Sequence, residues 1–536
     1  MPPSRGLQTA LQRAVPVAER DFIQPKGDVK TVLDLTDRDI QDDILFPTPA
    51  DAKGENLISW FAAPERRTVH FTPQVQTFPY RGQAQFGGRI SFEIDRVSAG
   101  DLIHMVALQV RLGHWLDEGV RAKLESGQIY YDLTNYPQDA WTYTNGIGRV
   151  LIESAEFVID DTTIERVDTV AADCILKLFP DLNNVFGFGR DGVGYTNIAE
   201  LVTPPSMNAT TEATGMFDPK RPFTTENGDI FCLVPFFFTR HPYKGSFPLL
   251  SVTGAQNSKV RINFNLRPFE QCIRQSAGWR TDCNETPLDK TVHFKTYPGN
   301  EPYLVQTCRN PPAFQDVKMV VFSSLIDDDM RKKYIHKPYE CIYRTLQPFI
   351  FAEPLKYAVA ASNSTVDSIK VQLPLEFNHP IEEIFWIIRR KATNINNDWL
   401  NFGTYTEYQY RSNPNLIPFE PLIEGSIAIN GIPIIQQSGK WFRHHIASLH
   451  RGGIVPYSSY IYGYSFARKP GMFSPSGTIN ASRTSSIRLD LTVRVPPSDS
   501  HSFNSAENQT WEVFVYATAI NWLRFQNGMG AAIYNS

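Results

Sequence analysis

From about residue 83 onward, apolar and polar residues alternate along the sequence with a period of two. The runs Val260–Leu266 (VRINFNL) and Ile487–Val495 (IRLDLTVRV) alternate without a break. Successive side chains of a β-strand point to opposite faces, so this pattern predicts strands that bury one face in a core. Helix-like segments are few: one is Thr169–Phe179, and another starts after Ser324 with acidic residues 327–329 in its first turn. The chain is therefore predicted to be all-β, with short strands and long connections, as in sandwiches and jelly rolls.

The two unbroken runs also echo each other at a distance. Val260 and Ile487, their first residues, are 227 positions apart (487 − 260), and each run follows a serine and a turn-like segment. This separation predicts two similar β domains of roughly 200 residues each, joined in the polar stretch Cys272–Pro312. The predicted limits are an N-terminal arm at 1–60, a first domain at 61–285 and a second at 286–536. The alternative is that the runs are unrelated, since any two sheet proteins contain alternating strands.

Residues 1–60 have a different composition from the rest of the chain. They contain prolines, many charges and two short helix-like pieces, Leu7–Ala14 and Asp34–Ile44. Such polar, proline-punctuated segments often order on binding a partner, so this segment is predicted to be an arm and not a folded domain.

Three long segments mix aromatic residues with Asn, Gly and Pro and lack sustained periodicity: Trp115–Gly146, Asn183–Asp229 and Asn394–Pro421. Loops of this length in compact domains are usually functional or disordered. Because exposed aromatic patches lower solubility, these loops are predicted to pack against a partner surface.

Composition and charge exclude several classes of protein. The chain has 536 residues, 42% hydrophobic and 20% charged, which is typical of a globular protein and excludes disordered, collagen-like and coiled-coil chains. The net charge of −4 argues against direct binding of nucleic acid, which needs a basic surface. Six cysteines without a Cys-x-x-Cys pair form neither a disulfide framework nor a zinc ribbon, and reduced thiols are expected. We also expect a soluble chain without a secretory leader or membrane span, because the densest apolar stretch, Phe231–Phe238, is too short to cross a bilayer.

Three motifs were weighed as sites of chemistry, and none is predicted to be one. Gly187–Gly192 (GFGRDG) matches a dinucleotide fingerprint, but neither flank provides the strand and helix that this motif needs. His444, His445 and His450 form the densest histidine cluster; neighbouring residues on a strand would point opposite ways, which disfavours a metal site. The acidic triplet 327–329 fits the first turn of a helix better than a calcium loop. The sequence therefore predicts no catalytic, cofactor-binding or metal-binding residues and no cofactor.

Several segments together resemble one family, the double jelly-roll major capsid proteins of nucleocytoplasmic large DNA viruses. The resemblance rests on four groups of residues in family order: Ile90–Arg96 with Gly100–Ile103; Asn145–Gly148 with Ile152–Ile159 and Ile164–Arg166; Leu233–Arg240 with Pro248–Leu250 and Val260–Ile262; and Tyr464–Ala467 with Pro475–Thr478, Asn480 and Ser482–Arg483. These groups span most of the chain between Ile90 and Val495. The part of the chain before about residue 80, which includes the arm, has no recognisable counterpart in the family.

The resemblance implies two tandem eight-stranded antiparallel jelly rolls and a non-enzymatic role. It implies a major capsid protein that assembles as homotrimers into pseudo-hexagonal capsomers of an icosahedral shell. Implied partners are neighbouring capsomers, minor capsid proteins reached through the arm, and an internal viral membrane close to the shell, without direct contact to nucleic acid. The implied location is the virion capsid, assembled in the host cytoplasm.

Two other functions remain open at this point. A double jelly-roll protein with a minor capsid or scaffold role would share the same sequence features. A jelly-roll enzyme or carbohydrate-binding module would share the fold alone, because a fold does not fix a function.

Overall fold

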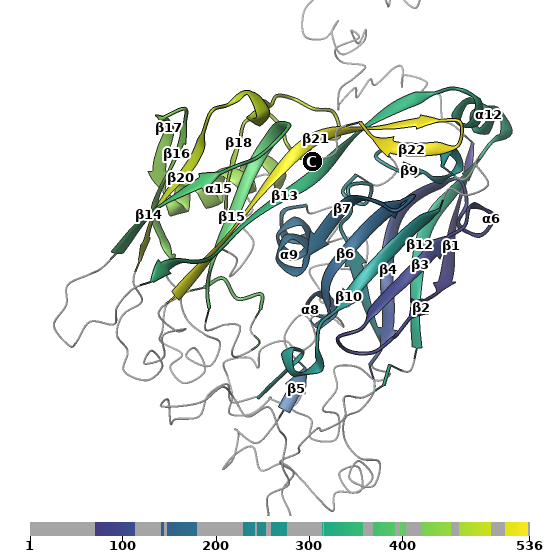
Figure 1. Cartoon of the computed structure of the whole chain (residues 1–536), viewed down its shortest axis with the longest axis horizontal. Helices are drawn as coiled ribbons and strands as arrows, with labels where there is room; N and C mark the ends of the chain where they lie inside the picture. The colour runs from purple at the N-terminus through teal and green to yellow at the C-terminus, as the bar shows by residue number, and fades with distance from the viewer. Residues whose placement is uncertain are drawn as a thin grey trace, which may run out of the picture. The chain divides into compact units, whose positions relative to one another are not determined.

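The computed structural model describes most of the chain beyond residue 70, and strands dominate it (Figure 1). The described residues are 70–112, 141–143, 147–179, 229–241, 244–252, 259–275, 313–314, 316–356, 368–391, 397, 399–403, 420–451, 460–494 and 510–533. The predicted arm and its two helix-like pieces lie outside these residues. Most of the three aromatic loops and the Gly187–Gly192 motif lie outside them as well.

The first half of the chain forms two antiparallel sheets with a four-strand path each. One path runs, in spatial order, through β1 (Phe71–Pro79), β12 (Asp316–Ile326), β4 (Leu102–Arg111) and β8 (Asp229–Val234). The other runs through β3 (Arg89–Ile94), β10 (Val260–Leu266), β6 (Ile152–Ile159) and β7 (Thr162–Asp168). Four short strands accompany these sheets. Strand β2 (Arg81–Gly82) pairs with β3, β9 (Phe247–Pro248) pairs with β4, and β5 (Trp141–Tyr143) pairs with β11 (Ile273–Gln275) in a separate two-stranded sheet. This two-sheet arrangement is a jelly roll, which we call the first barrel.

The second half repeats this topology strand for strand. One path runs through β13 (Tyr339–Lys356), β21 (Thr510–Gln526), β15 (Pro380–Arg390) and β18 (Ile461–Ser465), with β19 (Ile479–Asn480) and β22 (Met529–Ala532) at its margins. The other runs through β14 (Ser368–Leu375), β20 (Ile487–Arg494), β16 (Leu422–Ile429) and β17 (Ile432–Ser438). We call this unit the second barrel, and the predicted double jelly roll is confirmed.

The alternating runs fold as their period predicts. Buried and half-buried residues alternate along all of β10, where Ile262 and Phe264 are fully buried, and the same alternation runs along β20. Each strand lies inside its sheet, β10 between β3 and β6, and β20 between β14 and β16. The two runs are therefore equivalent strands of two copies of one fold, which confirms the internal repeat.

The hairpins that follow show how closely the barrels correspond. Strands β6 and β7 and helix α9 (Thr169–Leu178) have counterparts in β16, β17 and helix α15 (Gly439–Arg451), each beginning 270 residues later (152 to 422, 162 to 432, 169 to 439). Both hairpins turn through two residues of positive φ, Asp160-Asp161 (47° and 69°) and Asn430-Gly431 (50° and 82°). Two consecutive positive φ values are typical of the type I′ turn that matches strand twist, and Asn, Asp and Gly tolerate them best.

Strand β12 lies beyond the predicted domain limit at residue 285, yet it belongs to the first barrel. Its residues pair with β1 on one side and β4 on the other, and Met319 and Val321 are fully buried in the core. The polar stretch Cys272–Pro312 therefore precedes the last strand of the first barrel. The equivalent last strand of the second barrel, β21, pairs in the same way between β13 and β15.

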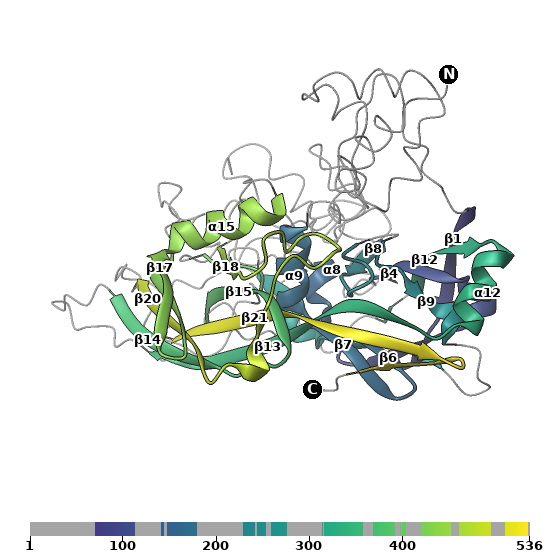
Figure 2. The same ribbon diagram turned by 90° about the horizontal axis from the view of Figure 1, so that it is seen from above.

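Among the residues that the structure describes, three helices of nine residues or more connect these strands. Helix α9 has Asp168 as its N-cap, with the side chain accepting from the Ala171 N–H, and α12 (Asp328–His336) is capped by Asp327 in the same way. Both predicted helices are thus confirmed, and the acidic triplet does begin a helix. Helix α15 was not predicted; it lies across β18 (Figure 2), with Phe442 and Ile446, one turn apart, buried on its inner side. Within the described part of the chain no helix is long and apolar enough to span a membrane.

The remaining helical pieces are short turns at strand ends. They are α6 (Arg96–Ala99), α8 (Ile147–Val150), η3 (Leu249–Ser251), η4 (Phe269–Gln271) and η5 (Ala481–Arg483).

Candidate functional site

The two barrels meet along a buried seam that contains charged as well as apolar side chains. We call it the inter-barrel junction: β7, α9 and residues 235–241 of the first barrel lie against β13, β15 and β21 of the second. A wholly apolar seam would cost less free energy, because each buried charge loses its hydration and needs partners that compensate for this loss. The charged groups of the junction are therefore the residues to examine first.

Two buried ion pairs face each other across the junction. Glu165 on β7, 2% exposed, binds Arg240 and also accepts a 2.7 Å hydrogen bond from the Phe237 N–H. Arg344 on β13, 5% exposed, binds the fully buried Glu382 of β15 through two of its nitrogens. The pairs are linked because Arg240 Nη1 donates to the Arg344 carbonyl oxygen at 3.3 Å.

Burial and the arginine partners act in opposite directions on the pKa of both carboxyls. Burial raises the pKa of Glu165, and the charge of Arg240 opposes this rise. Burial likewise raises the pKa of Glu382 against the hydrogen bonds and charge of Arg344. The neighbouring His241 is kept neutral, because burial and then the charges of Arg344 and Arg240 lower its pKa to about 3.

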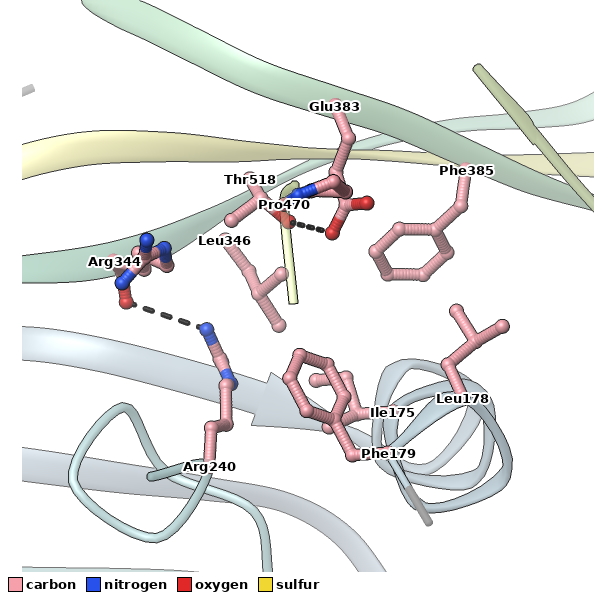
Figure 3. A pocket seen from close by; sticks show the side chains of 10 residues that line it. All are labelled: Ile175, Leu178, Phe179, Arg240, Arg344, Leu346, Glu383, Phe385, Pro470 and Thr518. Atoms are coloured by element: carbon pink, nitrogen blue, oxygen red, sulfur yellow. Dashed lines mark hydrogen bonds between the residues drawn. The ribbon is translucent and has the colours of Figure 1, made fainter. Parts of the chain in front are cut away.

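A small pocket lies beside these pairs, between α9 and the sheet of the second barrel (Figure 3). Leu178 and Phe179, at the end of α9, point toward Leu346 and Phe385 across it. Its polar lining residues are Arg240, Arg344, Glu383 and Thr518, and the Glu383 carboxylate accepts from the Thr518 hydroxyl at 3.3 Å. The pocket is apolar on its helix side, so it is a packing seam and not a polar substrate site.

Glu383 is held by a histidine of α15. His450 Nε2 lies 2.7 Å from Glu383 Oε2, and its ring packs against Phe179 with centroids 4.9 Å apart. Burial opposes ionisation of Glu383, but the charge and hydrogen bond of His450, with the Thr518 hydroxyl, lower its pKa overall. The contact joins the end of α9 in the first barrel to α15 in the second.

A further hydrogen bond crosses the junction at the start of α9. The Tyr516 hydroxyl on β21 donates to the Asp168 carboxylate, 3.0 Å from each of its oxygens. Tyr516 is 1% exposed and stacks on Phe385 at 5.3 Å. One carboxylate thus caps the helix of one barrel and anchors the sheet of the other.

Asn397 and Trp399 of the second barrel contact the first barrel just beyond the end of β10. The Arg267 guanidinium lies 4.1 Å from the centroid of the Trp399 ring, and the Trp399 indole N–H donates to the Gln271 carbonyl at 2.9 Å. Asn397 donates to the Glu270 carbonyl at 2.7 Å. The described part of the Asn394–Pro421 loop therefore packs on the first barrel of the same chain, and packing of this loop against a partner stays a prediction.

The connection between the barrels is itself fixed. Arg331 of α12 binds the buried Asp101, with Nη2 to Oδ2 at 2.7 Å, and Asp101 also accepts from the Ile326 N–H at 3.0 Å. At the start of β13, the hydroxyls of Tyr339 and Ser251 lie 2.7 Å apart. Both ends of the connection are therefore bonded to side chains of the first barrel, Asp101 and Ser251.

The histidines weighed in the sequence lie on helix α15 and not on a strand. His445 stacks between Trp441 (4.6 Å) and Tyr464 (5.5 Å), and His450 binds Glu383, whereas His444 is exposed. The strand assignment was wrong because the spacing of Phe442 and Ile446 is that of a helix. Among the described residues no three His, Cys, Asp or Glu side chains converge as metal ligands. The four described cysteines, 174, 232, 272 and 341, are free thiols.

The charges of the junction were not predicted from the sequence. The sequence does contain a signal for these charges. Glu382 and Glu383 interrupt an apolar strand between Ile381 and Ile384, and Glu165 follows Ile164 at a position that strand alternation predicts to be exposed. A charge inside a buried apolar run must have a partner, although its sequence position does not say which one.

Two family models match the chain. Residues 59–297 match the model described as "Major capsid protein N-terminus", and residues 345–531 match "Large eukaryotic DNA virus major capsid protein". The first match covers the first barrel except for its last strand, β12, and the second covers most of the second barrel; together they cover most of the sequence.

Relatives of known role show the same similarity. The major capsid protein of Phaeocystis pouchetii virus is 23% identical over 572 residues, which cover 90% of this chain and 96% of the relative. That of Chrysochromulina ericina virus is 23% identical over 356 residues, but the chain spans only 54% of that relative's length.

Solved structures share the fold at low sequence identity. A quasi-atomic model of the PBCV-1 virus capsid matches with a TM-score of 0.60 and 18% identity, covering 89% of this chain and all of the other. The Faustovirus major capsid protein matches with a TM-score of 0.56 and 12% identity, covering 90% of this chain and 94% of the other.

Proposed function

The chain belongs to the major capsid proteins of large eukaryotic DNA viruses, and we propose on this premise that three copies of it close into a ring of six barrels. As a member of this family the chain is a component of the virion capsid. The ring is one pseudo-hexagonal capsomer, and the icosahedral shell is built from many of them. The role is structural and not enzymatic, and its partners are copies of itself and neighbouring capsomers.

The observation that carries this proposal is the way the two barrels of one chain meet. They are equivalent folds, yet they touch through unlike faces, β7 and α9 of one against the β13–β21–β15 sheet of the other. Because the contact uses a different face on each barrel, one face of each kind stays uncovered in a single chain. Further copies that add through the same contact form a closed ring when the rotation from one barrel to the next divides a full turn.

The test is the mass of the purified full-length protein by native mass spectrometry and light scattering. We expect a stable species of three times 60.8 kDa, with no dimer populated at micromolar concentration. A monodisperse monomer over the same range of concentration would refute the trimer. Counting copies in purified particles separates a major capsid protein from a minor or scaffold one, since only the former makes up most of the shell.

We assign the domains from the same reasoning. Residues 1–60 are an arm, the first barrel extends to Ile326 at the end of β12, and the second begins at Tyr339 with β13. This moves the join from residue 285 to α12, because β12 completes the first barrel.

The arm is assigned a role in assembly. Its charged, proline-punctuated composition suits a segment that orders on minor capsid proteins or on adjacent capsomers at the base of the shell, close to an internal membrane. Deleting residues 1–60 should leave trimers intact and reduce the yield of closed shells. Loss of the trimer itself on this deletion would contradict the assignment.

A further inference from the structure

Two hairpins of the second barrel turn on the dipeptide Asn-Gly. Asn430-Gly431 connects β16 to β17, and Asn527-Gly528 connects β21 to β22. Both turns have two consecutive positive φ values, 50° and 82° in the first and 52° and 77° in the second, as in a type I′ turn. The two turns therefore have the same local chemistry and a similar backbone shape, and they differ in what surrounds them.

Asn-Gly is the dipeptide in which an asparagine side chain reacts most readily with its own backbone. The amide nitrogen of the glycine loses its proton and attacks the asparagine Cγ, the bond from Cγ to Nδ2 breaks, and ammonia leaves with the proton. Water then opens the resulting succinimide ring at one of its two carbonyls, which gives aspartate or isoaspartate. Glycine favours the attack because it has no Cβ to hinder the nitrogen and lets the backbone rotate freely. Water is the co-reactant of the second step.

A closed turn of this type prevents the reaction. In the left-handed region, with ψ near about +47°, the next amide nitrogen lies opposite to Cβ across the Cα–C bond and is out of reach of Cγ. The succinimide therefore forms only in molecules whose turn has opened. The rate at each asparagine then depends on the free energy of opening its own turn.

The turn at Asn430 is anchored to residues outside its hairpin. The Asn430 side-chain oxygen accepts from the Ser485 N–H at 2.9 Å and from the Ser486 N–H at 3.2 Å, and the Asn430 N–H donates to the Ser486 carbonyl oxygen at 2.9 Å. Ser485 and Ser486 directly precede β20, which lies inside its sheet between β14 and β16. Opening this turn therefore breaks these hydrogen bonds in addition to those of the hairpin.

The turn at Asn527 has no such anchor. Asn527 is exposed, and its side chain makes no hydrogen bond with any residue that the structure describes. Within the described chain, β22 is four residues long and pairs with β21 alone. Just beyond β22, the Ile533 N–H donates to the Trp522 carbonyl oxygen at 2.8 Å. A short strand at the margin of a sheet opens at a lower free energy than a hairpin bonded to an inner strand.

We propose that Asn527 is a site of spontaneous deamidation in the folded protein, whereas the hydrogen bonds of Asn430 protect it from the same reaction. These bonds lower the population of the open turn at Asn430 by on the order of tenfold to a hundredfold. The inference does not depend on how the chain assembles.

Deamidation at Asn527 changes the way β22 packs. Isoaspartate adds one main-chain carbon to a turn of two residues, so the register between β21 and β22 no longer fits the turn. Gly530 of β22 leaves no room for such a shift, because a Cβ on it would lie 3.0 Å from the Phe525 side chain and 3.1 Å from that of Val252. Val252 follows η3 in the first barrel, so a shift of β22 disturbs a contact with that barrel.

The test is a time course of the purified full-length protein in heavy-oxygen water at mildly alkaline pH, which promotes loss of the glycine amide proton. Peptide mapping by mass spectrometry reads each site separately, and the labelled oxygen marks conversion that happens during the incubation. Asn527 should convert on the order of ten times faster than Asn430, or more. In urea both turns are lost, so the two rates should become similar.

Two variants test whether opening of β22 sets the rate. Ile533→Pro removes the N–H that donates to the Trp522 carbonyl, so it should accelerate conversion of Asn527 several-fold and leave Asn430 unchanged. Ile533→Ala keeps this N–H and is the matched control, so it should accelerate conversion less.

The results that would overturn the inference are distinct. One is a rate at Asn430 in the folded protein that equals or exceeds the rate at Asn527. Another is an unchanged Asn527 over a period in which the urea-unfolded chain converts, because the turn would then stay closed. Acceleration of Asn430 by Ile533→Pro, or equal acceleration of Asn527 by both variants, would contradict local opening of β22 as the controlling step.

Discussion

Replacing Arg240 by methionine tests whether the junction depends on buried charge. The variant Arg240→Met keeps a long side chain in place and removes the cation that binds Glu165. The Glu165 carboxylate, 2% exposed, then retains only the Phe237 N–H as a donor. Removing one partner of a buried pair typically costs about 3–5 kcal/mol, against a total stability of about 5–15 kcal/mol for a domain.

The pH dependence of this loss follows from the pKa of Glu165. Without Arg240, the Glu165 carboxyl avoids burial as an unpaired anion by binding a proton. At pH 7, protonating a carboxyl with the ordinary pKa of 4.5 costs about 1.36 kcal/mol for each pH unit above that pKa, or roughly 3.4 kcal/mol. The folded state then binds a proton that the unfolded state lacks, so stability falls as the pH rises above 4.5. The loss relative to wild type should therefore be smaller at pH 5 than at pH 7.

The assay is urea unfolding at fixed protein concentration, followed by tryptophan fluorescence at both pH values. The double variant Glu165→Leu with Arg240→Met is the control, because it removes both charges and should recover most of the stability at pH 7. A loss of the same size at pH 5 and pH 7 would refute the reasoning, since it would come from packing and not from charge. A double variant no more stable than the single one would refute it as well.

Three other predictions concern single contacts. Trp399→Ala should lower the free energy of unfolding by about 2 kcal/mol, because it removes the cation–π contact to Arg267 and an indole hydrogen bond, and Trp399→Phe should lose less; thermal melting checks both. In the wild type, His450 lowers the pKa of the Glu383 carboxyl, so the stabilisation from this carboxylate is lost as the pH falls below 4.5 and the melting temperature drops. Glu383→Gln should make this drop smaller, and an unchanged slope of melting temperature against pH would contradict the prediction. Gly431→Ala should cost about 1 kcal/mol, because its φ of 82° strains any residue with a Cβ although nothing lies within 4 Å to clash; urea titration would show a smaller cost if the turn relaxes.

Much of the fold was readable from local patterns. The alternation in Val260–Leu266 predicted β10 and its burial, and the run from Thr169 with its capping Asp168 predicted α9. These signals are local because a strand or helix that buries one face repeats its apolar residues with its own period. The separation of the two alternating runs predicted the repeat, since equivalent strands of equivalent barrels need the same pattern.

Helix α15 and the place of β12 were not predicted. The apolar residues of α15, such as Phe442 and Ile446, do have a helical spacing, and the strand interpretation of its histidines missed that spacing. Strand β12 follows a long polar stretch, and such stretches occur inside domains as well as between them. Only its pairing with β1 and β4 places it in the first barrel.

The sequence by itself determined that the chain is all-β, that it contains two related halves, and which side of its regular strands is buried. The tertiary structure alone decided which buried charges meet: Glu165 with Arg240, 75 residues away, and Arg344 with Glu382, 38 residues away. It also decided which hairpin of two equivalent ones is covered. The physical reason is that periodicity reports the burial of a face through local backbone geometry, whereas an ion pair or an interface depends on distances between segments that only packing brings together.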